Sequence, residues 1–450
     1  MGTPWVLVLF VLTASACQAN VGAARARDAR WGERAESAYE ARVDVRDAAQ
    51  SLAHGSAATL SDPLRLEDVL AYAAAHRQEI VASRARARAA EERPAIASAL
   101  EDPMVMPSLD HLPFALHGVD ASLMIEQRFP LSGLLGHRRR AAAAEARRSR
   151  AESERVVAEV MLDAARAFLM LRERREMARV LEAQGGLARV LVKAASARYG
   201  AALGSQPEVL RAELEAARQA GVIAVLASEV AVAEAMLNAS LGRPPDARVP
   251  PLEAVPITRE APPWPRVREA ALRQRPELEV ARAELGRAEA EISTMEAMYL
   301  PMGTLRTGPS YTMSDKWGWM VTLGVTLPIW RGRLDGGVRE ARALRESARA
   351  ELASVTRMVE GDAATARAQL SAARTRVLTL RDDLLPRAKR GIDPAIAAYA
   401  AGATPLVSVL EATQALWSIE GELVAAELEL GVAWARLARA QGDYHAKERR

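Results

Sequence analysis

The stretch Trp317-Gly-Trp-Met-Val-Thr-Leu-Gly-Val-Thr-Leu327 decides the fold, because its side chains alternate strictly between two kinds. The odd positions carry tryptophan, valine and leucine, whereas the even positions carry glycine, methionine and threonine. A period of two belongs to a β-strand with one apolar and one more polar face, and eleven residues suffice for a tilted strand to cross a bilayer. The stretch therefore predicts a membrane-crossing strand.

A second segment of this kind lies 198 residues earlier, at 119–129, with mostly apolar odd positions and mostly polar even positions. Less regular partners precede the two segments, at about 103–114 and 302–313. Three prolines in these partners suggest bends or strand ends: Pro107, Pro113 and Pro309. Large aromatic residues near the strand ends predict an interfacial girdle: Trp317, Trp319, Trp330 and Phe129.

The two strand regions belong to two copies of one unit. Phe129-Pro130-Leu131 corresponds to Leu327-Pro328-Ile329 at an offset of 198, and Val69 corresponds to Val267 at the same offset. Tyr199 and Tyr399 correspond at an offset of 200. Landmarks in one order at a nearly fixed spacing indicate a tandem duplication.

Each strand pair is followed by a tract typical of very long helices. No proline occurs between Gly136 and Gly200, and apolar residues recur there in steps of three and four, as in a coiled coil. About 65 helical residues would extend roughly 100 Å. The second copy behaves alike from Arg339 to about Ala400, where Pro386 and Pro394 predict a kink or break.

The fold class is therefore mainly α with membrane β. We expect a signal peptide at 1–17 and a flexible leader at 18–62. The first repeat follows at 63–241, with its helical hairpin at 133–241, and a proline-rich connector occupies 242–265. The second repeat covers 266–441, with strands at about 302–313 and 317–327 and a hairpin at 332–441, and a polar tail ends the sequence at 442–450.

The N-terminus predicts export from the cytoplasm. Trp5–Leu12 is an apolar run too short to span a bilayer, and Ala14-Ser15-Ala16 supplies the small residues of a cleavage site. Residues 12–17 resemble a bacterial lipobox, so two outcomes stay open: lipid anchoring at Cys17, or simple cleavage nearby. Cys17 is the only cysteine, which excludes a disulfide within the chain.

The composition excludes several function classes. The 60 basic and 57 acidic residues nearly cancel, so no nucleic-acid partner is expected. No metalloprotease, P-loop or nucleophile-elbow motif occurs, so we expect no enzyme, no catalytic residue and no cofactor.

Two groups of side chains could bind metal ions, and each also has an interpretation without a metal. Asp110, His111, His117 and Asp120 could hold a divalent cation, or could simply form a solvated loop, and we assign no metal site to them. Methionines gather in the strand regions, where their thioethers suit Cu(I) or Ag(I), or serve as lipid-facing filler: they are Met104, Met106, Met124, Met302, Met313 and Met320.

Four strands cannot close a barrel, and a sheet in lipid cannot keep free edges. The chain must therefore oligomerise, and three copies would supply twelve strands and twelve helical rods.

Several short motifs at the ends of the predicted strands resemble those of a known protein family. Asp102-Pro103-Met104, Gln127-x-Phe129-Pro130-Leu131 and Leu327-Pro328-Ile329-Trp330-x-Gly332 are similar to the TolC-type outer-membrane efflux proteins, most of all to the factors of cobalt-zinc-cadmium and copper-silver resistance. The resemblance covers about residues 63–441.

The resemblance implies a homotrimeric duct in the outer membrane of a Gram-negative bacterium, with a large periplasmic extension. It implies a periplasmic adaptor and an inner-membrane pump of the resistance-nodulation-division type as partners, with heavy-metal cations as cargo. Adaptor contact and gating fall by position on the hairpin tips: Gly200, Leu203, Gly204 and Ser205 in the first copy, and Gly402, Ala403 and Thr404 in the second. Two alternatives stay open: an outer-membrane factor for drug efflux or type I protein secretion, and a periplasmic coiled-coil adaptor.

Overall fold

The computed structural model describes residues 60–110, 120–253, 260–312 and 315–443. They belong to the unit that begins at Leu60. The signal peptide, Cys17 and nearly all of the predicted leader lie outside the described residues.

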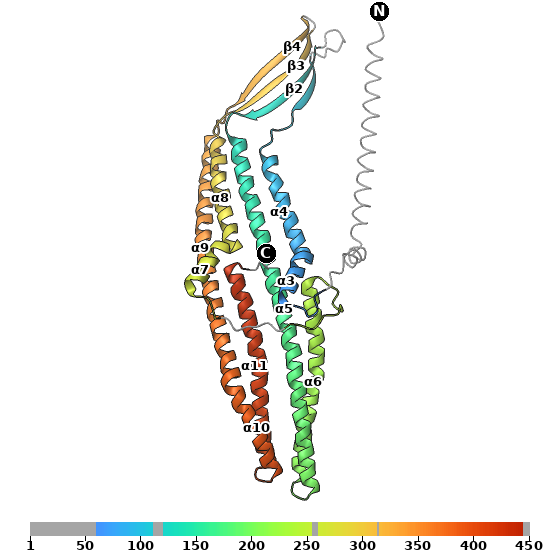
Figure 1. The fold of residues 1–450 in the computed structure, drawn as a ribbon. Coiled ribbons are helices and arrows are strands. Elements are labelled where there is room, and N and C mark those ends of the chain that lie inside the picture. Colours follow the sequence, from blue (N-terminus) through green and yellow to red (C-terminus); the bar gives the residue numbers. More distant parts are fainter. Residues whose placement is uncertain (1–59, 111–119, 254–259, 313–314, 444–450) are drawn as a thin grey trace, which may run out of the picture. The chain divides into compact units, whose positions relative to one another are not determined.

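The two repeats have the same order of elements (Figure 1). The first repeat comprises α3 (Leu66–His76), α4 (Gln78–Ala97), β1 (Met104–Asp110), β2 (Asp120–Pro130), α5 (Leu134–Gly200) and α6 (Gln206–Leu241). The second comprises α7 (Trp264–Gln274), α8 (Pro276–Ala297), β3 (Met302–Thr312), β4 (Lys316–Thr326), α9 (Arg331–Leu378), the π-helical turn η1 (Thr379–Leu384), α10 (Leu385–Ala400) and α11 (Leu406–Gln441). The predicted fold class, with two tandem repeats of a strand pair and a long helical hairpin, is confirmed.

The helix pairs that precede the strands were not predicted, because they lack a long apolar stripe. Helix α4 buries only Ile80, Ser83, Ala87 and Ala90. Small side chains allow α4 to lie close to α5, where the Ser83 hydroxyl is 3.0 Å from that of Ser153.

The four strands form one antiparallel sheet in the order β1-β2-β3-β4. The pairing of β2 with β3, for example Glu126 opposite Arg306, joins the two repeats. Pro107 and Pro309 lie inside β1 and β3, so of the two predicted alternatives, bends or strand ends, they are not strand ends. Pro113 lies outside the described residues.

Pro309 is accommodated by an interruption of hydrogen bonding between β2 and β3. The paired positions are Ser122 with Ser310 and Ile125 with Thr307, and the two residues between them on each strand form no ladder pair. Proline has no N–H to donate, so a strand can carry it where the ladder has a gap.

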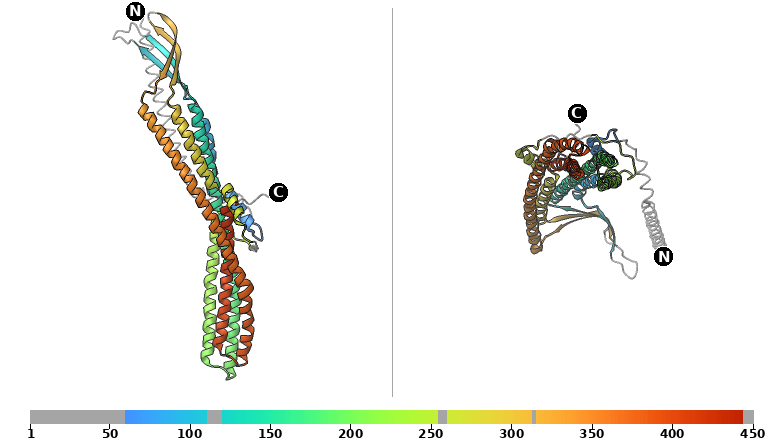
Figure 2. Two further views of the ribbon diagram at one scale, coloured as in Figure 1. Left: turned by 90° about the vertical axis from the view of Figure 1, so that its left-hand side faces the viewer. Right: turned by 90° about the horizontal axis from the view of Figure 1, so that it is seen from below.

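The helices continue the order of the strands. Near the sheet α4, α5, α8 and α9 contact one another in that sequence, and towards the hairpin tips α5 packs against α6 and α11 (Figures 1 and 2). Two apolar clusters hold this arrangement, one built on Val69, Phe168 and Leu237, the other on Val267, Leu370 and Leu437. Val69 and Val267 are the residues that the repeat alignment places at equivalent positions.

Of the two prolines for which a kink or break is predicted in the second long helix, one lies beside a change of helix type. The π-helical turn η1 ends at Leu384, and Pro386 is the second residue of α10. Pro394 lies inside α10, which continues to Ala400.

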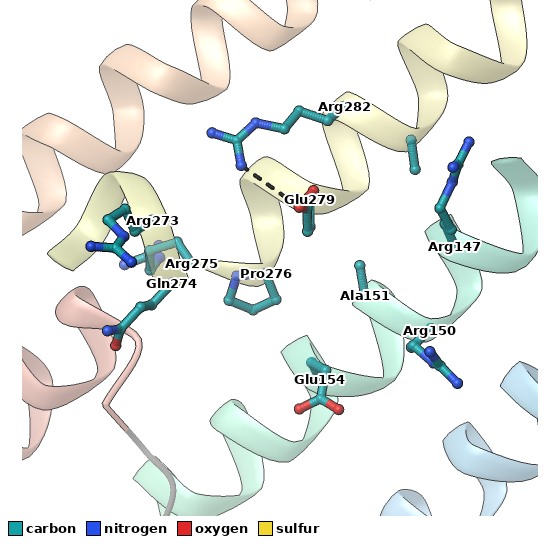
Figure 3. A pocket seen from close by; sticks show the side chains of 11 residues that line it. Arg147, Arg150, Ala151, Glu154, Arg273, Gln274, Arg275, Pro276, Glu279 and Arg282 are labelled. Atoms are coloured by element: carbon teal, nitrogen blue, oxygen red, sulfur yellow. Dashed lines mark ion pairs between the residues drawn. The ribbon is translucent and has the colours of Figure 1, made fainter. Parts of the chain in front are cut away.

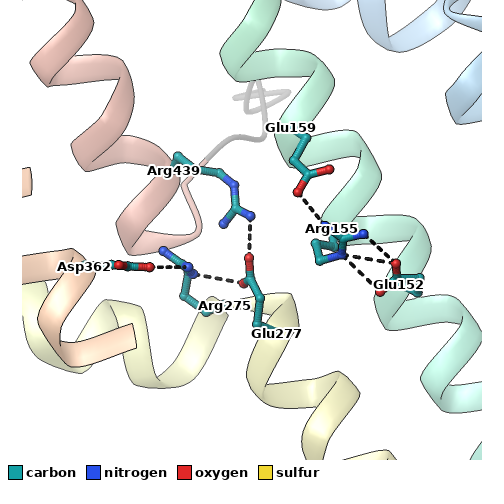
Figure 4. A network of polar contacts seen from close by, with 7 residues as sticks. All are labelled: Glu152, Arg155, Glu159, Arg275, Glu277, Asp362 and Arg439. Carbon is teal, nitrogen blue, oxygen red and sulfur yellow. Dashed lines mark hydrogen bonds and ion pairs between the residues drawn. The ribbon is translucent and has the colours of Figure 1, made fainter. Parts of the chain in front are cut away.

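A polar network ties the end of α11 to α8 and α9 (Figure 4). Arg275 donates to Glu277 at 2.9 Å and to Asp362 at 3.2 Å, and Arg439 donates to the other oxygen of Glu277. Burial by itself would raise the pKa of Glu277, but the hydrogen bond from Arg439 and the charges of Arg275 and Arg439 outweigh it and lower that pKa. The Glu277 ion pair therefore stabilises the fold above the unfolded pKa of glutamate, about 4.3, and this contribution is lost as pH falls through the lower folded pKa.

We expect Glu277→Gln to lower the free energy of unfolding at neutral pH by about 2 kcal/mol, because it removes charge-assisted hydrogen bonds. The difference should become smaller at acidic pH, once the pH falls through the lowered folded pKa and the wild-type carboxyl is itself protonated. Thermal unfolding followed by circular dichroism at neutral and at acidic pH measures this. Glu279→Gln is the matched control, because Glu279 is 63% exposed and lies 3.8 Å from Arg282. An equal loss of stability for Glu277→Gln at both pH values would contradict the assignment.

Candidate functional site

The two hairpin tips are built on one plan. Helix α5 ends at Gly200 and α6 begins at Gln206, while α10 ends at Ala400 and α11 begins at Leu406. In each tip a backbone N–H returns to a carbonyl five residues earlier, from Leu203 to Arg198 at 2.8 Å and from Ala403 to Ala398 at 2.9 Å. This pattern is typical of a helix that ends in a left-handed residue.

The left-handed residue differs between the tips. It is Ala202 in the first tip, at φ 57°, and Gly402 in the second, at φ 81°. A side chain at 402 would also meet the Arg198 guanidinium at 3.3 Å. Both its backbone conformation and its close neighbour therefore favour glycine in the second tip.

The predicted tip residues lie at these turns. Leu203 is 69% exposed, so an apolar side chain projects from the first tip. Ser205 precedes α6, and its N–H donates to Glu208 at 3.4 Å. Pro405 occupies the equivalent place before α11 and has no N–H to donate. Gly200, Gly204, Ala403 and Thr404 complete the turns.

Arg198 joins the two tips. Its guanidinium donates to the carbonyl of Leu203 at 2.7 Å and to the carbonyl of Tyr399 in the other hairpin, and it lies 4.8 Å from the centre of the Tyr399 ring. The Tyr399 hydroxyl donates to Glu208 at 3.5 Å. Arg198, Tyr399 and Glu208, which we name the tip clamp, thus connect both hairpins.

Burial makes the tip clamp specific to one of the two repeats. Tyr399 is 1% exposed, whereas its counterpart Tyr199 is 51% exposed. Burial first, and then the charge of Glu208, raise the pKa of Tyr399, so its hydroxyl stays protonated as a donor. The tip clamp was not predicted. The equivalence of Tyr199 and Tyr399 marked the place, but the repeat could not tell which tyrosine is buried.

The predicted girdle residues of the second repeat are strongly exposed. Trp317 is 76% exposed, Trp319 69% and Trp330 73%, with Trp330 directly before α9. The Trp319 indole donates to Thr307 at 2.8 Å. Phe129 is half-buried at the end of β2 and would crowd any side chain at Gly303. Their role as a membrane girdle remains a proposal.

Helix α6 exposes an apolar stripe. Among the described residues it is the one helix that length and composition would allow to cross a membrane, and most of that stretch is exposed. The stripe consists of Leu210, Leu214, Val222, Val225, Val232 and Met236. Apolar area of this extent on one helix face indicates a surface that another helix covers.

An arginine-lined cleft of about 580 Å³ lies between α5 and the α7–α8 junction (Figure 3). Several of its arginines already have acidic partners, because Arg150 pairs with Glu91, Arg275 with Glu277 and Arg282 with Glu279. We assign the cleft a structural role at the contact of the two repeats.

The described part of the chain contains no cluster of the side chains that most often bind metal ions. No three His, Cys, Asp or Glu side chains there lie together in a way that could hold an ion. His111 and His117, considered above with Asp110 and Asp120, lie outside the described residues.

Comparison with known proteins gives concordant results. Residues 267–443 match the family described as outer membrane efflux protein. Outer membrane efflux protein BepC of Brucella suis biovar 1 (strain 1330) is 26% identical over 297 residues, and the matched region spans 64% of this chain and 64% of BepC. These matches are to efflux proteins and agree with the expectation that the chain is not an enzyme.

Solved structures share the fold. The outer-membrane channel OprN superposes with a TM-score of 0.74 at 18% identity, covering 84% of this chain and 90% of OprN. CusC gives 0.74 at 16% identity, covering 84% and 92%, and VceC of Vibrio cholerae gives 0.71 at 17% identity, covering 84% and 96%.

The family match runs from within α7 through α11, and the first repeat has the same order of elements as the second. The second repeat thus matches the outer membrane efflux protein family, and both repeats share the TolC-type fold of the solved outer-membrane channels.

Proposed function

We propose that the protein is the outer-membrane channel of an efflux system, a passive exit duct for substrates delivered from the periplasm. The observation that carries the proposal is the four-stranded sheet, whose strands connect directly to long helices. One face carries Leu123, Ile125 and Trp319, the other Ser122, Glu126 and Arg306. An apolar outer and a polar inner face are what a membrane barrel requires.

The sheet is incomplete in one chain. In the part of the chain that the structure describes, β1 and β4 each pair on one side only. Unpaired strand edges are not tolerated in lipid, so further copies must supply the missing neighbours. We propose a homotrimer with twelve strands, in which a neighbouring chain also covers the apolar stripe of α6.

The remaining assignments follow from this arrangement. We propose that the hairpin tips contact a periplasmic adaptor, which links the duct to a resistance-nodulation-division pump, and that the tip clamp holds the tips closed. The tryptophans would lie at the membrane interface, and Cys17 would carry a lipid anchor. A coiled-coil adaptor would not need a sheet with an apolar face, which disfavours that alternative.

We propose heavy-metal cations as the cargo. Likeness of fold does not separate this cargo from drugs or secreted proteins, because one fold can serve different functions.

Deletion of the gene should lower the tolerated concentration of silver, copper, cobalt, zinc or cadmium at least about tenfold, the change expected when an export route is closed rather than weakened. Growth in a series of metal and drug concentrations measures it, with the intact gene restored on a plasmid as the control. Loss of tolerance to drugs alone would replace the metal assignment, and unchanged tolerance to both would overturn the efflux function.

A further inference from the structure

Three methionines lie at one level of the sheet. Met106 of β1 pairs with Met124 of β2, and Gly308 of β3 pairs with Met320 of β4. The pairs on either side, Ser122 with Ser310 and Ile125 with Thr307, place Met124 opposite Gly308. Met106, Met124, Gly308 and Met320 therefore form a row across all four strands, which we name the methionine row.

The methionine row lies on the polar face of the sheet. Directly paired residues point to the same side, and side chains alternate along a strand. The neighbouring row on one side contains Ser108, Ser122 and Ser310, and the row on the other contains Glu126 and Arg306. Of the two interpretations given to these methionines, lipid-facing filler does not fit, because the lipid-facing side is the one with Leu123 and Trp319.

Gly308 adds no side chain to the row, and the backbone of β2 approaches it closely, so that a Cβ atom there would lie 1.9 Å from the Leu123 carbonyl oxygen. Adjacent strands are about 4.8 Å apart, so Met106 and Met124 are direct neighbours, while Met124 and Met320 are about 10 Å apart with no side chain between them. Methionine has three rotatable bonds, so thioethers from both sides can reach toward each other over the Gly308 backbone. Met124 is 8% exposed and Met320 is 44% exposed, so the row runs from a covered to an open position.

The neighbouring charges disfavour hard cations. The nearest carboxylate, Glu126, accepts from Arg128 at 2.9 Å and from Arg306 at 2.5 Å, so its oxygens are already engaged. Calcium and magnesium require oxygen ligands, and two arginines repel a dication more strongly than a monocation. Neutral sulfur ligands without a free carboxylate instead suit soft monovalent metal ions.

We propose that Met106, Met124 and Met320 form a thioether site for a soft monovalent cation, Cu(I) or Ag(I), on the wall of the exit path. The proposal rests on the proposed function, because only in an assembled barrel does this face line a pore. Weak, reversible binding along a pore concentrates an ion without trapping it.

The test is titration of the purified, detergent-solubilised protein with silver nitrate in chloride-free buffer, followed by calorimetry. The variant Met106→Leu/Met124→Leu/Met320→Leu keeps apolar side chains of similar volume. Compared with wild type, it should lose about one bound Ag(I) per chain, with at least a tenfold weaker residual affinity. Met358→Leu, an exposed methionine of α9, is the control and should bind as wild type does. Equal Ag(I) binding by the wild type and the triple variant would overturn the site.

Potassium conductance of the same preparations in planar bilayers separates this proposal from the channel function. Wild type and triple variant should conduct equally, because leucine and methionine have similar volumes and leave the width of the pore unchanged. If neither the wild type nor its Arg198→Ala variant, in which the proposed gate is released, forms a pore, the channel is overturned instead. Conducting channels with identical silver binding would overturn the methionine site alone.

Discussion

Alanine at position 308 should prevent the protein from assembling in the outer membrane. A Cβ atom at Gly308 would lie 1.9 Å from the carbonyl oxygen of Leu123, which is backbone and cannot rotate away. Pro309 follows directly, at the interruption between β2 and β3. Overpacking usually costs about 1–3 kcal/mol, and we expect Gly308→Ala to reach or exceed the upper value because two strands must separate.

The effect should be large because β2 and β3 hold the two repeats together in the sheet. Their separation would expose two further edges to lipid, where each unpaired backbone group costs several kcal/mol. Immunoblots of outer-membrane fractions, with and without heating of the sample, measure the amount of assembled protein.

Gly318→Ala provides the matched control for position 308. Its Cβ would lie 3.8 Å from the Ser310 hydroxyl oxygen, an ordinary contact on the same face of the same sheet. We expect wild-type amounts of assembled protein for Gly318→Ala. Wild-type amounts for Gly308→Ala would show that β2 and β3 are farther apart in the membrane than the close contact implies.

Removal of the Arg198 side chain should open the tips. Arg198→Ala deletes the hydrogen bond from a charged donor and the cation–π contact that reach Tyr399 in the other hairpin, which together contribute about 3 kcal/mol. If these contacts form only in the closed state, their loss shifts the equilibrium between closed and open tips about a hundredfold toward the open state. Open probability in single-channel recordings measures this change.

Arg179→Ala is the control for position 198. Arg179 is on the same helix, 76% exposed, and pairs at 3.0 Å with Glu176 of that helix. Its loss should leave the open probability unchanged. In the converse experiment, cysteines placed across the tips should block export when oxidised. An Arg198→Ala channel that stays as closed as wild type, or oxidised tips that still export, would contradict the gate.

The sequence by itself determined the duplication, the strands and the long hairpins, but not the helix pairs that precede the strands. Alternation over eleven residues specifies strands with two different faces, proline-free tracts specify long helices, and the offset of 198 specifies that both occur twice. These are periodic properties of neighbouring residues, so they can be read without knowing which segments meet. The need for further copies follows from the same count of strands.

The tertiary structure alone decided which residues meet. Pairing of β2 with β3 places Met124 opposite Gly308, although 184 positions separate them in the printed sequence. Arg198 donates to the carbonyl of Tyr399, which is 201 positions later in the sequence. Such contacts depend on strand register and on which of two equivalent side chains is buried, and a duplicated sequence leaves both choices open until the two repeats pack against each other.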